Sequence, residues 1–118
     1  MELYERLRAR ALEGRPILAG LVGCGQMGSG LIHVTHEMEG LETRAIADIQ
    51  VERPLRVLKS LGLSEAEICV TNEEGEAEDA LQSGRYLVTE DALLPACLPS
   101  VEVVVEATGL TEVGARVA

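Results

Sequence analysis

A glycine-rich turn between an apolar run and a helix-like segment constrains this chain more than any other feature. Residues 20–30, GLVGCGQMGSG, hold five glycines in eleven positions. The preceding run, ILAGLV (17–22), is continuously apolar, which is typical of a strand buried on both faces of a parallel sheet. The segment that follows predicts an amphipathic helix over 26–39, because apolar residues recur there at helical spacing: Met27, Leu31, Val34 and Met38. The glycines therefore lie where a buried strand passes into a helix.

Strand-like and helix-like segments go on alternating along the chain. We predict further strands over 43–48, 85–91 and 101–109, and a helix over 51–61. Residues 67–84 predict an inserted short strand and helix, with a capping box from Thr71 to Glu74 and Gly84 at the helix end. The segment ALLPACLPS after residue 91 predicts a short, proline-broken helix or turn, and a last helix is expected from Thr111.

This alternation predicts an α/β fold with right-handed crossovers between parallel strands. We expect a Rossmann-type doubly wound sheet in three layers, α/β/α, truncated after about four to five strands. Residues 1–15 are expected to form an N-terminal helix outside it, because ELYERLRARALE is amphipathic and GRP follows. Residues 16–118 are then expected to form this Rossmann-type domain, and a separate substrate domain is expected to be absent.

Composition narrows the classes of partner. The chain has 118 residues and a formal net charge of −10, which disfavours nucleic acid and anionic membrane surfaces as partners. No signal peptide or 18-residue apolar window is present, and the three cysteines show no CxxC spacing. We therefore expect a cytoplasmic protein without a disulfide framework. An exposed sheet edge left by the missing half of the fold predicts a homo-oligomer.

Three glycines of the turn form a GxGxxG pattern, in which each position has a physical task. Gly23 permits the tight turn, Gly25 lets the backbone approach a pyrophosphate, and Gly28 allows the helix to pack closely on the strand. The N–H groups of Gln26, Met27 and Gly28 would then point at the phosphates, at the positive end of the helix dipole. The alternative is that the glycines serve close packing alone, with Gly30 doing the same one turn later.

Asp48 follows the second predicted strand, 20 residues after Gly28. An acid at this place accepts the hydroxyl protons of an adenosine ribose, which favours NAD over NADP because a 2′-phosphate would meet a carboxylate. Arg53 weakens this preference, since a guanidinium can pair with a 2′-phosphate. The alternative role for Asp48 is a plain N-cap of the following helix.

The last predicted strand ends in EATG. Ala107, Thr108 and Gly109 are small enough for a nicotinamide ribose to lie against them, although a turn that merely needs small residues explains them too.

Three other features could be interpreted as metal-binding or reactive sites, but each has a simpler structural interpretation. His33 and His36 lie three residues apart on the first predicted helix, but no further ligand of suitable spacing completes a metal site. Cys24 at a helix N-terminus has two interpretations: a reactive thiol, or a small residue that fills the turn. The acidic run EEGEAED (73–79) is more typical of a solvated helix face than of a cation site. We therefore assign no metal ligand.

Three segments carry a resemblance to a known family: PILAGLVGCGQMGSGLIHVTHEMEGLETRAIADI, EAEDALQSGRYLVTEDALLP and VEVVVEATGLTEVGARVA. Together they resemble the NAD(P)-binding part of homoserine dehydrogenase-like oxidoreductases, in the branch with a C-terminal SAF domain that includes deoxyxylulose phosphate reductoisomerase-like enzymes. The resemblance implies a domain that binds NAD or NADP for hydride transfer to or from a small hydroxy or keto substrate. It also implies that the glycine-turn residues contact the pyrophosphate, that Asp48 contacts the adenosine ribose, and that Thr108 and Gly109 lie by the nicotinamide. It supplies no catalytic residue, because those of the family lie beyond position 118. A non-catalytic NAD(P)-sensing or interaction module is the alternative.

Overall fold

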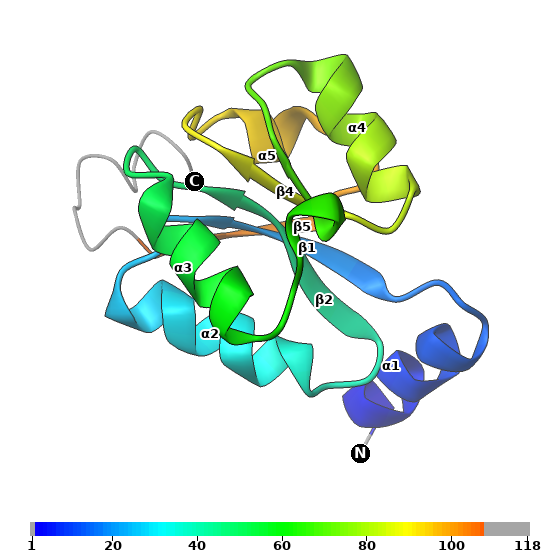
Figure 1. Cartoon of the computed structure of the whole chain (residues 1–118). Helices are drawn as coiled ribbons and strands as arrows, with labels where there is room; N and C mark the ends of the chain where they lie inside the picture. The colour runs from blue at the N-terminus through cyan, green and yellow to red at the C-terminus, as the bar shows by residue number, and fades with distance from the viewer. Residues whose placement is uncertain (1, 108–118) are drawn as a thin grey trace.

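The computed structural model describes residues 2–107 as an α/β fold with five parallel strands (Figure 1). The strands lie in the order β3-β4-β2-β1-β5. In chain order the elements are α1 (Glu2–Leu12), β1 (Ile17–Val22), α2 (Gln26–His36), β2 (Leu41–Ala47), α3 (Glu52–Ser60), η1 (Glu65–Glu67), β3 (Ile68–Val70), α4 (Glu74–Gln82), β4 (Tyr86–Thr89), α5 (Leu94–Cys97) and β5 (Val103–Glu106). The predicted fold class is confirmed, and the first strand has the predicted bounds.

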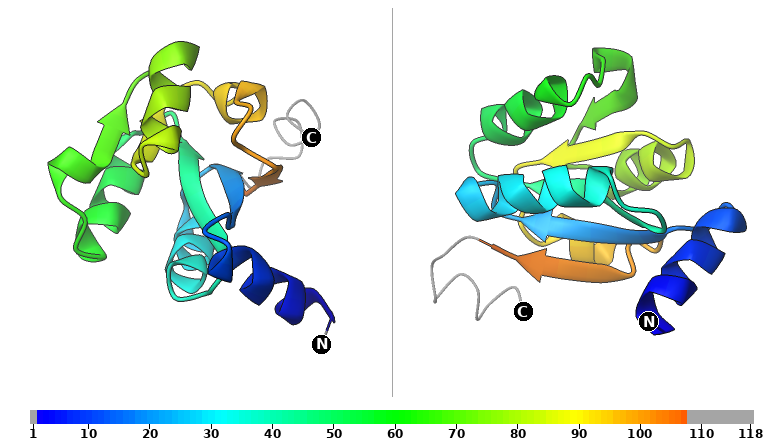
Figure 2. Two further views of the ribbon diagram at one scale, coloured as in Figure 1. Left: turned by 90° about the vertical axis from the view of Figure 1, so that its right-hand side faces the viewer. Right: turned by 90° about the horizontal axis from the view of Figure 1, so that it is seen from below.

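Two apolar layers hold the helices against the sheet. Helices α2 and α3 cover one face, where Leu21, Ile32 and Leu58 are buried, and α4 and α5 cover the other, where Leu18, Leu81 and Leu94 are buried. The left view of Figure 2 shows the sheet edge-on between these layers, with α1 projecting at one end. In the described part of the chain, no helix is long and apolar enough to cross a membrane.

The order in which successive strands are added to the sheet changes direction at β1. From β1 the chain passes through α2 to β2 on one side, and later returns from β4 through α5 to β5 on the other side of β1. Such a switch in strand order is where open α/β sheets bind ligands, in a crevice outside the carboxyl ends of the neighbouring strands. The glycine-rich turn follows β1 at this crevice.

Helix α2 buries a different face from the one that its apolar stripe indicates. Its buried residues are Gly28, Ile32 and Thr35. The stripe contains Met27 and Val34, which are 78% and 59% exposed. The stripe runs along the flank of α2 instead, towards β5, because the close approach of Gly28 to the sheet fixes the rotation of the helix about its axis.

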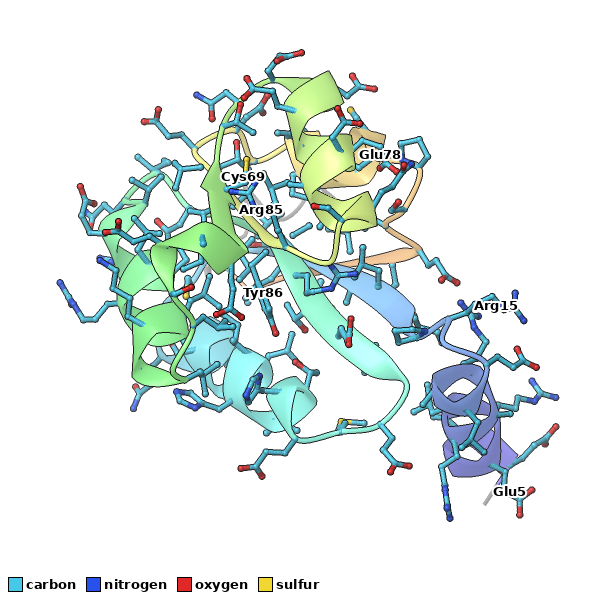
Figure 3. The ribbon with its side chains drawn as sticks, turned by 45° about the vertical axis from the view of Figure 1, so that its right-hand side comes forward. Glu5, Arg15, Cys69, Glu78, Arg85 and Tyr86 are labelled. Carbon is cyan, nitrogen blue, oxygen red and sulfur yellow. The ribbon has the colours of Figure 1, made fainter. Side chains whose placement is uncertain are left out.

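Residues 67–84 form the predicted inserted strand and helix. Strand β3 pairs in parallel with β4 and extends the sheet by one strand. The Arg85 guanidinium donates hydrogen bonds to the carbonyls of Ala66 and Ile68, at 3.1 and 3.0 Å, and lies beside β3 in Figure 3. Gly84 has φ +84°, as a helix end requires.

The capping box predicted from Thr71 to Glu74 is wrong. Helix α4 begins after Glu73 and has no side-chain cap, whereas Thr71 accepts a hydrogen bond from the Glu73 N–H at 3.1 Å. The start of the helix is shifted because the Thr71 hydroxyl sustains a local turn of its own. A capping box is present instead from Ser64 to Glu67, ahead of β3.

One face of β5 lacks a helix within residues 2–107. Val103 and Val105 alternate towards the α2 side of the sheet and are 45% and 37% exposed. Val104 points to the opposite face, where it approaches Gly20. Val105 and the apolar stripe of α2 line one hollow, and Val103 lies on the same face of β5. We call these residues together the α2–β5 surface: Met27, Leu31, Val34, Val103 and Val105.

Candidate functional site

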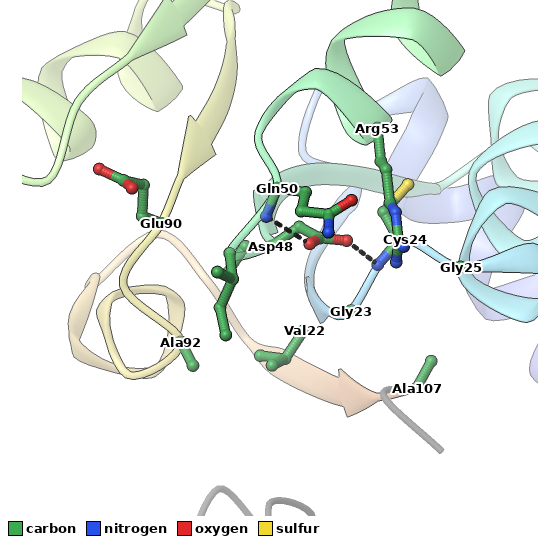
Figure 4. A pocket seen from close by; sticks show the side chains of 12 residues that line it. Val22, Gly23, Cys24, Gly25, Asp48, Gln50, Arg53, Glu90, Ala92 and Ala107 are labelled. Carbon is green, nitrogen blue, oxygen red and sulfur yellow. Dashed lines mark hydrogen bonds between the residues drawn. The ribbon is translucent and has the colours of Figure 1, made fainter. Parts of the chain in front are cut away.

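A cavity of about 290 Å³ opens at the carboxyl ends of β1 and β2, beside the glycine-rich turn (Figure 4). Its walls come from the turn itself, the loop between β2 and α3, the loop after β4, and the end of β5. The lining residues are Val22, Gly23, Cys24, Gly25, Ala47, Asp48, Ile49, Gln50, Arg53, Glu90, Ala92 and Ala107. Among the predicted site residues, the structure brings together Gly23, Gly25, Asp48, Arg53 and Ala107 in one cavity.

Each glycine of the turn has a different environment. Gly23 has φ +94°, a left-handed conformation that side chains rarely adopt, so the sharp exit from β1 requires glycine. A Cβ on Gly28 would lie 2.2 Å from the carbonyl oxygen of Gly23, so this glycine is required by the contact between helix and strand. A Cβ on Gly25 would meet no atom within 4 Å, and the same holds for Gly30. Close packing therefore accounts for Gly28 but not for Gly25 or Gly30.

The space above Gly25 belongs to the cavity, and α2 begins directly behind it. Gly25 is the N-cap of α2 and supplies no side-chain hydrogen bond, while its carbonyl accepts the Ser29 N–H at 2.8 Å. The amides of a helix's first turn have no intrahelical acceptor. Here no capping side chain covers them, so the positive end of the helix dipole faces the open side of the turn.

Asp48 joins the glycine turn to the β2–α3 loop. One carboxylate oxygen accepts the Cys24 N–H at 2.9 Å and the other accepts the Gln50 N–H at 2.8 Å. Asp48 is not the N-cap of α3, because that position is Val51 and has no side-chain cap. Its carboxylate is therefore held in place by two main-chain donors at the wall of the cavity, as the dashed lines in Figure 4 show.

Charged groups of both signs flank Asp48. Arg53, in the first turn of α3, lies on the side of Cys24 in Figure 4, and Glu90 lies on the opposite side, after β4. Sequence reasoning missed Glu90, Ala92, Ile49 and Gln50 as lining residues. The position of Ile49 and Gln50 directly after Asp48 could have indicated that they line the cavity. No sequence pattern indicates Glu90 and Ala92, because their place beside Asp48 depends on the pairing of β4 with β2.

The other predicted site residues lie elsewhere. Gln26 and Met27 are exposed on the first turn of α2 and do not line the cavity. Met27 borders a second, shallower hollow over the α2–β5 surface, together with Leu31 and Val105. Thr108 and Gly109 lie outside the described residues.

Cys24 is buried within the turn rather than presented as a nucleophile. Burial is the main cause that raises the pKa of its thiol, opposed by a contact with the Ser29 hydroxyl at 3.7 Å; Asp48 raises this pKa further and Arg53 lowers it. A thiol with a raised pKa is mostly protonated at neutral pH and is a weak nucleophile. The structure therefore supports the packing role of Cys24 over the reactive one.

No cluster of three or more potential metal ligands occurs among residues 2–107. His33 and His36 are both exposed on α2.

Comparisons with known proteins add no family to these observations. A scan against protein-family models finds no match, and a search of curated proteins finds none either.

Proposed function

We propose that this chain binds a nicotinamide dinucleotide at the cavity beside the glycine-rich turn and presents it for hydride transfer. The observation that carries the proposal is the contrast between Gly25 and Gly28. Packing explains the glycine at 28, whereas the missing side chain at 25 leaves open space directly before an uncapped helix N-terminus. A pyrophosphate is the group that makes use of such a space, because it needs close backbone approach and N–H donors together.

The residues around the turn fit the rest of the ligand. Asp48 would hold the adenosine ribose, since each of its oxygens has a lone pair left after one main-chain hydrogen bond. Because both oxygens are tied to main-chain amides, this carboxylate does not swing aside to admit a 2′-phosphate. We therefore propose NAD(H) over NADP(H), despite the nearby Arg53.

The bound dinucleotide would supply the hydride chemistry, and this chain would supply its orientation. The turn and the start of α2 would fix the phosphates, and Ala107 at the end of β5 would leave room for the nicotinamide half. From the sequence resemblance we propose that the chain serves an oxidoreductase of the homoserine dehydrogenase-like kind that acts on a small hydroxy or keto substrate. We assign no catalytic residue in this chain. We also propose that the chain self-associates through the α2–β5 surface.

Calorimetric titration with NAD⁺ and NADP⁺ tests the proposal. We expect NAD⁺ to bind with a Kd on the order of micromolar, and NADP⁺ to bind at least about 10-fold more weakly. Asp48→Asn removes the negative charge and should narrow that ratio, because a 2′-phosphate then no longer meets a carboxylate. Glu52→Gln makes a matched charge change on α3 outside the cavity and should leave the ratio unchanged. Absence of heat with either dinucleotide at millimolar concentration would refute the proposal.

A further inference from the structure

We infer that three cations on α3, Arg53, Arg56 and Lys59, guide the anionic dinucleotide into the cavity. We call these residues the α3 cation row. The inference rests on the proposed function and deepens it, because it assigns the rate of ligand capture to residues outside the glycine-rich turn.

The α3 cation row differs from the other cations of residues 2–107, because its side chains have no bonded partner there. Arg85 donates to the carbonyls of Ala66 and Ile68. The remaining cations form ion pairs with glutamates: Arg6, Arg8, Arg10, Arg15 and Arg44. By contrast, the three side chains of the row are exposed and form no ion pair or hydrogen bond within the described residues.

The row begins at the cavity and continues along the outer side of α3. Arg53 lines the cavity, and in Figure 4 its side chain extends from α3 towards Cys24. Leu58 faces the core, and residues three apart on a helix are neighbours on its surface, so the cations form one continuous row. A rise of about 1.5 Å per residue places Arg56 about 4.5 Å and Lys59 about 9 Å from Arg53 along the helix axis.

An anionic ligand of this chain needs a local source of positive charge. The chain has a net charge of −10, and the cavity lining holds two acids, Asp48 and Glu90, against one cation, Arg53. Helix α3 carries three cations against one acid, Glu52, so its side-chain charge is positive. Such charges act on a ligand before contact, over a Debye length of about 10 Å at 0.1 M salt. A cluster of one sign beside a cleft raises the association rate of an oppositely charged ligand by about 10-fold or more.

The two outer cations should act on capture of the ligand rather than on its retention. Arg56 and Lys59 do not line the cavity, so they do not contact a ligand that is bound within it. Charges at the rim of a binding site mainly change the association rate and its dependence on salt, whereas buried contacts change the dissociation rate. Arg53 lies at the cavity and can do both, so the test leaves Arg53 unaltered.

Stopped-flow measurement of NADH binding to the full chain, followed by NADH fluorescence, tests this inference. The double variant Arg56→Gln/Lys59→Gln removes two unit charges at about 10 Å from the path of an ionised pyrophosphate. We expect the association rate constant to fall about 5-fold at an ionic strength of about 10 mM. At about 150 mM, where the Debye length is about 8 Å, it should fall less than about 2-fold. The dissociation rate constant should stay within about 2-fold of that of the unaltered chain.

A matched double variant, Arg6→Gln/Arg15→Gln, makes the same change of net charge far from the cavity. Both residues are exposed and precede β1, whereas the cavity opens at the carboxyl ends of the strands, so this variant should associate at the unaltered rate. The inference is overturned if Arg56→Gln/Lys59→Gln keeps the unaltered association rate at low ionic strength, or if both variants slow association equally. Faster dissociation with unchanged association also overturns it. These outcomes leave the proposed function intact, whereas failure of NADH to bind at millimolar concentration overturns both.

Discussion

Replacing Gly25 with alanine separates ligand binding from packing more cleanly than any other change in the turn. The new Cβ meets no atom within 4 Å, and the backbone at this position has φ −80°, which alanine adopts freely. The stability cost should therefore stay within about 1 kcal/mol, the difference between glycine and alanine at a helix N-cap. The methyl group would nevertheless occupy the space in which we place the pyrophosphate.

The expected loss of affinity follows from the contacts that the methyl group prevents. A phosphate held away from the turn loses about two charge-assisted hydrogen bonds, each worth roughly 1.5 kcal/mol, so Kd for NAD⁺ should rise about 100-fold. Gly30→Ala is the matched control on the same helix, because it also meets no atom but lies outside the cavity. It should leave Kd unchanged and raise stability by up to about 1 kcal/mol through helix propensity.

Gly28→Ala should show the opposite behaviour, because its Cβ would lie 2.2 Å from the Gly23 carbonyl oxygen. Helix α2 must move away from β1 to accept it, which should destabilise the chain by about 1–3 kcal/mol. Urea unfolding followed by circular dichroism gives the stabilities, and calorimetry gives Kd. The reasoning is refuted if Gly25→Ala binds NAD⁺ as tightly as the unaltered chain while remaining folded.

Three other expectations follow from the structure. Iodoacetamide should modify the exposed Cys97 faster than the buried Cys24 at pH 8, by mass spectrometry, and bound NAD⁺ should slow Cys24 further; equal rates would contradict its burial. Because folding raises the pKa of the Cys24 thiol above its usual 9.0, the stability that this neutral thiol contributes is complete below that pH and lost above it, so Cys24→Ser should flatten the decline of the unfolding midpoint at alkaline pH. Light scattering should detect a dimer that Val105→Glu dissociates, since a charge would enter the α2–β5 surface; a monomer at high concentration would contradict the proposed self-association.

Sequence periodicity was sufficient to predict most helices and strands, because the patterns that indicate them lie within short segments of the chain. The continuous apolar run of β1, the glycine that follows it and the helical spacing after it are all read within 20 residues. The inserted β3 and α4 were also visible, through a β-prone piece and a helix-ending Gly84 with its positive φ. The predicted acid after β2, Asp48, lies at the cavity because parallel strands bring their carboxyl ends to the same edge of the sheet.

The remaining features depend on contacts between distant residues. The rotation of α2 about its axis is set by Gly28 against Gly23, so the most apolar stripe is not the buried one. The presence of Glu90 in the cavity depends on the pairing of β2 with β4, and its orientation depends on Asn72, 18 residues earlier. No pattern within one segment encodes either pairing.

Asp48 both binds main-chain N–H groups of the glycine-rich turn and the β2–α3 loop and is the proposed ribose contact, which has a consequence for redesign of the proposed ligand preference. Exchanging Asp48 for a neutral or basic residue, the obvious route to accommodating an extra phosphate, would also leave at least one of the two main-chain N–H groups that it binds, those of Cys24 and Gln50, without its acceptor, and would loosen the glycine-rich turn. Any such redesign would therefore need a compensating hydrogen-bond acceptor near the glycine-rich turn. Substitutions at Asp48 and at the position of that acceptor should combine non-additively in a double-mutant cycle.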